Sequence, residues 1–215
     1  MIYILRLTYK AFGHISHKLS SIFDYIVTVY KFSCLGVRFV DVETSGIPFV
    51  DISCKKDSSI NIAKGLRMNN GAYRNQIGFG KRKCYLIADG GSIYIGENCG
   101  MSQTTLIAFG ADIYIGENVK IGAGVKVYTT NFHSLNFENR RTRVLDSKDT
   151  KTENVSIGND CFIGAGTIIL KGVSIGDRSI IGAGSVVVND IPSDTIWGGN
   201  PAVQIRQNEI LCCRK

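Results

Sequence analysis

Three histidines are the residues of this chain best suited to acid–base chemistry near neutral pH. His14 and His17 lie in an amphipathic N-terminal stretch, where we expect them at the surface. His133 lies in a polar, charged segment between Tyr128 and Val155, where no core role is available to it. An imidazole in that setting can remove the proton of an attacking hydroxyl group. A surface histidine often has no function, so the surrounding pattern has to decide.

The seven cysteines indicate neither a nucleophile nor a metal centre. They are odd in number, scattered and without a C-x-x-C spacing, which argues against a disulfide scaffold and against a zinc site, and for a reducing compartment. Cys99 and Cys161 occupy the small inward position of the repeat described next, where packed thiols are expected. The sequence therefore predicts no metal ligands.

From about Val50 the chain follows a period of six residues. In its C-terminal half an aliphatic residue returns at every sixth position without a slip: Ile157, Ile163, Ile169, Ile175, Ile181 and Val187. Successive residues at this spacing would rotate to different faces of a helix. The spacing fits a coil of three short strands per turn, with successive coils stacked ~4.8 Å apart. The hexads therefore predict a parallel β-solenoid, in which the glycine after each aliphatic residue turns the coil.

The interrupting segment and the two flanks divide the chain. We predict a helical N-terminal cap or membrane-proximal region at 1–45, the β-helix at 46–192 with an inserted loop at 129–154, and a C-terminal tail at 193–215. A long loop in a regular solenoid is usually functional or mobile. Apolar residues in 1–32 recur at steps of three, four or seven and predict one or two helices. These helices either cover the open strand edge of the first coil or lie on an anionic membrane surface.

The 215 residues carry a net charge of +7, with a basic excess in residues 1–40 and a run without acids from Ser58 to Ala88. Such a surface suits an anionic cofactor, an acidic polymer or a membrane face, or is simply a solvated face. Nucleic acid is not a predicted partner, because no nucleic-acid recognition motif is present. Without a signal-peptide pattern or an apolar stretch of ~20 residues, the chain is predicted to be cytoplasmic, with contact to the inner face of the membrane through residues 1–32 as the membrane alternative.

The repeated hexads, the loop with His133 and the closing sequence D-I-P-S-D-T-I-W-G-G-N-P-A-V-Q-I-R together resemble the hexapeptide-repeat acyltransferases. The resemblance covers residues 50–206 and is closest to sugar O-acetyltransferases of the maltose, galactoside and capsular-polysaccharide kind. It implies a left-handed parallel β-helix with a short helical N-terminal region, and a homotrimer with active sites between neighbouring subunits. It also implies acetyl-CoA as the acyl donor, with no metal required.

The resemblance also implies roles for individual residues. His133 would act as general base in a direct transfer, and the backbone N–H of Ala165 would stabilise the oxyanion. The small residues beside the pantetheine arm would be Gly164, Ala165 and Ala183. Asn189 and Arg206 would lie near the CoA nucleotide. Asn131 and Ser102 would contact the acceptor. Asn189 departs from the Lys or Arg that relatives often have there, which weakens the expected phosphate contact.

The sequence thus predicts an acetyl-CoA-dependent O-acetyltransferase acting on a saccharide hydroxyl, in a cell-envelope or capsular polysaccharide or its precursor. One alternative is an N-acetyltransferase acting on an amino sugar or nucleotide-sugar, although the G-x-G-x-x-G turn with which such relatives often begin is lacking. A second alternative is a non-catalytic β-helix subunit, which would not need a histidine in the loop. The zinc carbonic anhydrases of this fold need three histidine ligands, and only His133 lies among the repeats.

Overall fold

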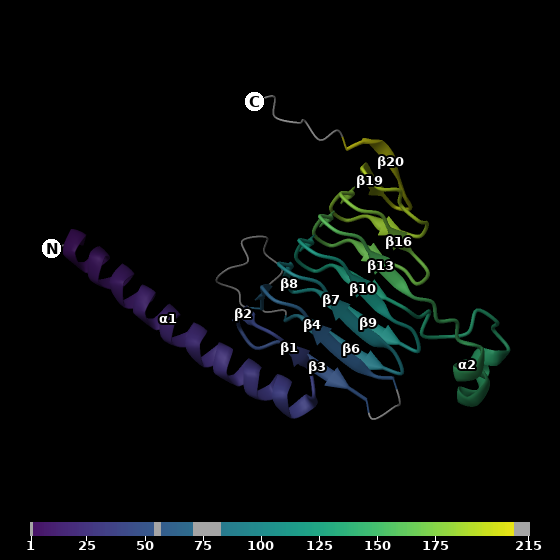
Figure 1. Ribbon diagram of the computed structural model, residues 1–215, viewed down its shortest axis with the longest axis horizontal. Coiled ribbons are helices and arrows are strands. Elements are labelled where there is room, and N and C mark those ends of the chain that lie inside the picture. Colours follow the sequence, from purple (N-terminus) through teal and green to yellow (C-terminus); the bar gives the residue numbers. More distant parts are fainter. Residues whose placement is uncertain (1, 54–56, 71–82, 209–215) are drawn as a thin grey trace.

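The computed structural model describes residues 2–53, 57–70 and 83–208, with side chains described from residue 19 onward. The N-terminal region is one helix, α1 (Ile2–Leu35), and the chain then winds into a column of short strands (Figure 1). The helix ends at Gly36, whose φ of +70° is the left-handed conformation that glycine adopts readily. The next residue, Val37, donates its N–H to the Phe32 carbonyl at 2.9 Å, which closes the last turn.

Three sheets form the sides of the column, and each strand pairs in parallel with the equivalent strands of the neighbouring coils. Sheet A contains β1 (Arg38–Phe39), β4 (Ser59–Ile62), β7 (Ser92–Ile95), β10 (Ile113–Ile115), β13 (Val155–Ile157) and β16 (Ser174–Ile175). Sheet B contains β2 (Val42–Ser45), β5 (Leu66–Asn69), β8 (Gly100–Ser102), β11 (Lys120–Ile121), β14 (Phe162–Ile163), β17 (Ile180–Ile181), β19 (Thr195–Gly199) and β20 (Ala202–Gln207), the last pairing antiparallel. Sheet C contains β3 (Phe49–Ile52), β6 (Tyr85–Asp89), β9 (Thr105–Phe109), β12 (Lys126–Tyr128), β15 (Ile168–Ile169) and β18 (Val186–Val187).

The core is the column of hexad aliphatics inside the three sheets. Ile157 pairs with Ile175, Ile163 with Ile181, and Ile169 with Val187, each directly above its partner one coil away. All of them are buried. The six-residue period therefore corresponds to one side of the coil, and the predicted fold, a left-handed parallel β-helix with a helical N-terminal region, is confirmed.

The glycine after each hexad aliphatic has a different role from the predicted turning of the coil. A Cβ atom on Gly164 would lie 2.5 Å from the backbone nitrogen of Ala183 in the next coil, so glycine there permits the coils to stack closely. The turn itself is made two positions later, where Gly166 has a φ of +72°. At the equivalent corner of another side, Asp160 takes a φ of +57°. Stacking distance and turning are thus assigned to different positions of the hexad.

The coils begin earlier than residue 46, because β1 and β2 already pair with β4 and β5. At the other end, β19 and β20 continue sheet B within the segment predicted as a tail. The C-terminal half of α1 packs against the first coil: Thr28 and Phe32 are buried, and the Asp24 carboxylate accepts the Gly46 N–H at 2.8 Å. One side of this part of the helix therefore lies against the start of the coil stack.

Candidate functional site

The inserted loop leaves the coil after β12 and returns at β13, and it contains a 3₁₀ turn, η1 (Asn139–Arg141), and a short helix, α2 (Arg143–Asp149). Its neck is closed by backbone pairing. Asn131 donates its N–H to Lys151 at 3.2 Å, Glu153 donates to Thr129 at 2.9 Å, and Thr130 forms an antiparallel bridge with Thr152. The loop therefore stands on the column as an ordered unit.

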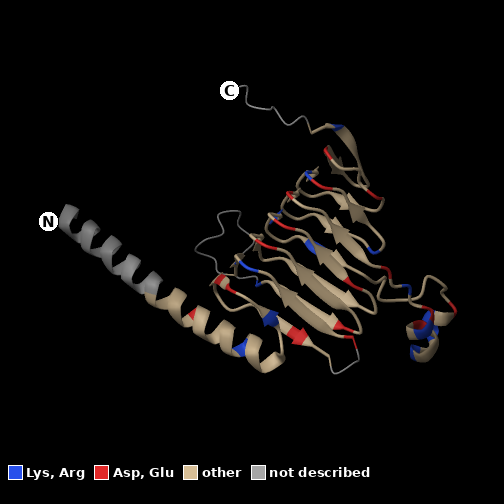
Figure 2. Cartoon of the chain, in the orientation of Figure 1, with Lys and Arg blue, Asp and Glu red and all other residues tan. Residues whose placement is uncertain are grey.

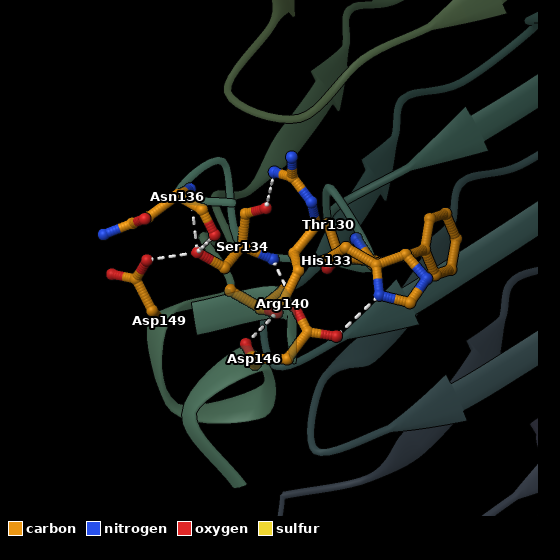
Figure 3. Close-up of polar contacts among 9 residues, drawn as sticks. Thr130, His133, Ser134, Asn136, Arg140, Asp146 and Asp149 are labelled. Atoms are coloured by element: carbon orange, nitrogen blue, oxygen red, sulfur yellow. Dashed lines mark hydrogen bonds and ion pairs between the residues drawn. The ribbon is translucent and has the colours of Figure 1, made fainter. Parts of the chain in front are cut away.

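His133 lies near the start of this loop and is held by a carboxylate from α2 (Figure 3). Its Nδ1 is 2.7 Å from Oδ2 of Asp146, and the other oxygen of that carboxylate accepts the Ser134 N–H, also at 2.7 Å. The His133 side chain is 69% exposed, whereas that of Asp146 is 16% exposed. The histidine is thus fixed at one nitrogen and open to solvent around the rest of its ring.

A second group of contacts holds the loop around Ser134, which is buried. Its hydroxyl donates to Asp149, whose carboxylate also accepts the Asn139 side-chain amide at 3.1 Å. Arg140 donates a guanidinium N–H to the Ser134 carbonyl at 2.6 Å. Figure 3 shows that Asp149 and Arg140 both lie beside Ser134. Asp146 therefore lies on a helix that hydrogen bonds hold in place within the loop.

Hydrogen bonding keeps both carboxylates ionised. The hydrogen bond from His133, followed by the Ser134 N–H, lowers the pKa of Asp146 below its ordinary value. The Ser134 hydroxyl and the Asn139 amide lower the pKa of Asp149 in the same way. An ionised Asp146 can only accept, so His133 places its ring proton on Nδ1 and leaves the Nε2 lone pair available. This arrangement can take a proton from a hydroxyl group placed beside Nε2.

The residues expected at the pantetheine arm lie where the chain passes from sheet B to sheet C, which we call the B–C edge. Ala165 lies between β14 and β15, and Ala183 lies between β17 and β18 one coil later. The Ala165 carbonyl accepts the Gly184 N–H at 2.8 Å, whereas its own N–H has no acceptor among the described residues. An unpaired N–H beside a path of small residues is suited to stabilise a developing oxyanion.

Within one chain the predicted site residues form two groups. Ser102, Gly164, Ala165 and Ala183 lie at the B–C edge, whereas Asn131, His133 and Asn189 lie where the chain passes from sheet C to sheet A, the C–A edge. The strands of sheet C run between these two edges. Arg206 belongs to neither group, since it lies in β20 at the end of sheet B and is exposed. The chain alone therefore does not bring the predicted base and the predicted oxyanion donor together.

The contacts of the remaining predicted residues are local. The Ser102 hydroxyl accepts the Asn69 side-chain amide at 3.1 Å, and the Arg206 guanidinium donates to the Gln207 carbonyl at 3.2 Å. Asn189 lies two residues after the end of β18 and is exposed. A surface cavity of about 340 Å³ lies elsewhere, lined by Asp41, Val42, Glu43, Gly65, Leu66, Arg67, Asn98 and Lys120, and it includes none of the predicted site residues.

Asp146 is not among the site residues predicted from the sequence. A signal for it is nevertheless present: Asp146 and Asp149 are three residues apart, a spacing that places two side chains on one side of a helix. Neighbouring carboxylates in the same loop as the candidate base would have been reasonable partners for it. Without the fold of the loop, however, the separation of thirteen residues between His133 and Asp146 conceals their contact.

The cysteines behave as predicted from the repeat. Cys99 and Cys161 are buried, as is Cys84. Burial raises the pKa of Cys161 to about 11 and that of Cys84 to about 12, so both thiols stay protonated at neutral pH. Cys54, Cys212 and Cys213 lie outside the described residues. Within the described part of the chain, no group of three or more His, Cys, Asp or Glu side chains is arranged to hold a metal ion.

Residues 154–189 match the family model of the bacterial transferase hexapeptide, described as six repeats. No curated protein sequence matches the chain. The matched segment contains the coils with the strict hexads, and the same coil geometry extends from β1 to β19. The chain therefore contains the repeats of the bacterial hexapeptide transferases, and it is similar in structure to hexapeptide-repeat acetyltransferases.

The solved structures that are similar to this chain include acetyltransferases and an N-acyltransferase. A hexapeptide-repeat-containing acetyltransferase from Vibrio cholerae is 25% identical, with a TM-score of 0.55 over 92% of this chain and 88% of that one. A maltose O-acetyltransferase from Clostridium difficile 630 is also 25% identical, with a TM-score of 0.54 over 89% and 83% of the two chains. An N-acyltransferase from Bacillus cereus, in complex with dTDP-4-amino-4,6-dideoxyglucose and coenzyme A, shares the fold at 20% identity, with a TM-score of 0.65 over 84% and 89%.

Proposed function

We propose that the chain is an acetyl-CoA-dependent O-acetyltransferase that acts on a saccharide hydroxyl, with His133 as the general base. The observation that carries the proposal is the pair formed by His133 and Asp146 at 2.7 Å, in which the imidazole side chain is largely exposed to solvent. A non-catalytic β-helix subunit has no need for a braced, ionised carboxylate behind an exposed imidazole. The geometry therefore favours catalysis over a purely structural role.

The chemistry follows from the groups present. His133 Nε2 removes the proton of the acceptor hydroxyl as its oxygen attacks the carbonyl carbon of the acetyl thioester. The negative charge that develops on the carbonyl oxygen is stabilised by the Ala165 N–H. The C–S bond then breaks, CoA leaves as a thiolate, and the imidazolium returns the proton to that sulfur. Asp146 stabilises the charged imidazolium during these steps and remains ionised throughout.

The acceptor class is proposed from the solved relatives and from the open site. The Clostridium difficile relative is named for acetyl transfer to maltose, and the Bacillus cereus structure contains a nucleotide-linked amino sugar. With His133 69% exposed, the base can reach a hydroxyl on a bulky glycan such as a cell-envelope or capsular saccharide or its precursor. Acetyl-CoA, the proposed donor, is a cytosolic metabolite, so we propose that the reaction takes place in the cytoplasm.

We further propose that the active protein is a homotrimer whose sites lie between subunits. The two groups of site residues lie at opposite edges of sheet C, so a neighbouring copy is needed to bring an Ala165 N–H to His133. The outer face of sheet C is also apolar: Ile107 pairs with Tyr128 on it, and Leu170 and Val188 are exposed in the next coils. Packing between copies would remove that apolar surface from water.

Acetyl-CoA turnover, read as free CoA thiol, tests the proposal with a panel of saccharide acceptors. His133→Ala should lower turnover by about two to four orders of magnitude while CoA binding stays intact, because a general base contributes about that much. Leu135→Ala is the matched control, since Leu135 is 77% exposed in the same loop. Near-normal turnover in His133→Ala would sink the assignment. Amino sugars in the same panel distinguish the N-acetyltransferase alternative, which predicts transfer to amines and none to hydroxyls.

A further inference from the structure

The outer side of α1 is an apolar stripe that nothing in the described structure covers. Leu19, Ile22, Phe23, Ile26 and Tyr30 are 63%, 56%, 63%, 58% and 71% exposed. Their spacing of three, one, three and four residues places them along one side of the helix. We call these five residues the α1 stripe. Figure 1 shows α1 running outward from the first coil toward the N-terminus.

The orientation of the helix is fixed from its other side. Thr28 and Phe32 are buried against the coils, Asp24 accepts the Gly46 N–H at 2.8 Å, and Lys31 donates to the Pro48 carbonyl at 3.3 Å. Lys31 also lies 5.2 Å from the centroid of the Phe49 ring. Rotation of the helix to bury the stripe would break all of these contacts. The stripe therefore faces away from this chain because the fold holds it there.

Charge indicates what would cover it. The α1 sequence contains Arg6, Lys10, Lys18 and Lys31 against Asp24 alone. In the described part of the helix the charged residues are Asp24 and Lys31, and the rest of that part is uncharged (Figure 2). Helices that pair with their own copies normally place opposite charges beside the apolar seam, and the α1 sequence offers a single acid for this. A net positive helix repels its copies and is attracted to an anionic surface.

We infer that the α1 stripe lies in the interface of an anionic lipid membrane, with the helix in the membrane plane. Aromatic and aliphatic residues on one side and an excess of lysine and arginine in the rest are the composition of interfacial helices. Phe23 and Tyr30 add aromatic rings, which sit well at the level of the headgroups. Within the described residues, no helix is long and apolar enough to cross a bilayer. Membrane contact of this kind does not depend on the proposed acetyl transfer.

The experiment measures partition of the full-length protein onto vesicles of phosphatidylcholine alone and of phosphatidylcholine with phosphatidylglycerol. Two variants on α1 gain the same negative charge: Ile26→Asp lies in the stripe, and Ser20→Asp is an exposed position outside it. Because both variants share the electrostatic penalty, their ratio isolates the apolar contact. Ile26→Asp should bind anionic vesicles about tenfold more weakly than Ser20→Asp, from the loss of one buried isoleucine.

Binding to anionic but not to neutral vesicles, weakened by salt and lost selectively in Ile26→Asp, supports the inference. Absence of wild-type binding, equal binding to both lipids, or equal losses in the two variants would overturn it. Sedimentation velocity without lipid reports the competing occupant: a smaller assembly in Ile26→Asp together with no vesicle binding would make the stripe a contact between copies. Turnover with a soluble acceptor is measured on the same samples, so loss of the membrane contact and loss of the proposed activity are separately visible.

Discussion

At the scale of single residues, the candidate site is defined by where one proton sits. Asp146 is ionised and accepts a hydrogen bond from the protonated Nδ1 of His133, and this leaves the Nε2 lone pair free to act. Asp146→Asn keeps the shape of the side chain and removes its charge. We expect turnover to fall about 10- to 100-fold, with the KM for acetyl-CoA unchanged, because the partner of a functional histidine sets its tautomer and stabilises its charged form.

Steady-state kinetics across acceptor and acetyl-CoA concentrations measure this effect. Glu138→Gln is the control, because it removes the same charge from an exposed position of the same loop. Asp146→Glu should recover part of the rate if the carboxylate itself matters. Equal losses in Asp146→Asn and Glu138→Gln would show that loop charge in general is responsible, and would contradict a positioning role for Asp146.

How far the site could be predicted differs between these residues for a physical reason. His133 is identifiable because it is a titratable group in a polar interruption of a regular repeat. Asp146 is one of several acids in that interruption, and only the hydrogen bonds from His133 and Ser134 distinguish it. Periodic patterns specify which residues point inward. They hold no information about contacts inside a loop that has no period.

At the scale of elements, the inserted loop depends on its two carboxylates. Hydrogen bonds within the loop hold the pKa values of Asp146 and Asp149 below the ordinary 3.8, so the folded loop binds fewer protons than an opened one. Their contribution to loop stability is therefore complete above about pH 4 and is lost as the pH falls through the lowered values. Amide hydrogen exchange in residues 129–154, corrected for intrinsic rates, should be slow at pH 5 and faster at pH 3.

Amides of the coils in the same sample serve as the internal control for this loop measurement, because their strands pair through backbone hydrogen bonds that do not titrate. Asp149→Asn should make the loop amides exchange faster already at pH 5, so that their exchange rates at pH 5 and pH 3 differ less than in the wild type. If loop and coil amides lost protection together, acid would be unfolding the whole column, and the loop would not be an element with its own pH dependence.

Among the elements, the coils after residue 113 were the most predictable. Their hexads repeat without a slip because each aliphatic residue must sit directly above its partner, as Ile157 does above Ile175. The first coil lacks that signature. β1 and β2 are recognisable as strands only through their pairing with β4 and β5, which lie more than twenty residues later in the sequence. The exposure of one apolar side of α1 could likewise not be predicted from the sequence. A helical period shows that two faces of a helix differ, but not which face the coils cover.

At the scale of the whole molecule, the two edges of sheet C determine how activity must be organised. His133 stands at the C–A edge, and Ala183 is exposed at the B–C edge, where the pantetheine arm is proposed to lie. His133→Ala removes the base, and Ala183→Trp should block the arm without disturbing the core. In a homotrimer with sites between subunits, each variant alone should be inactive. Mixed trimers should nevertheless contain some sites with an intact histidine from one copy and an intact channel from its neighbour.

Co-expression of the two variants with different affinity tags, followed by purification through both tags, gives the mixed assemblies. In a cyclic trimer that contains both variants, one of the three sites is intact, so turnover should recover to about a third of the wild-type value. His133→Ala carrying both tags is the control and should stay inactive. If each site were formed within one chain, every site in the mixture would contain one of the two lesions. Turnover would then stay at the level of the parents, and the separation of His133 from Ala183 would have to be bridged by rearrangement of a single chain.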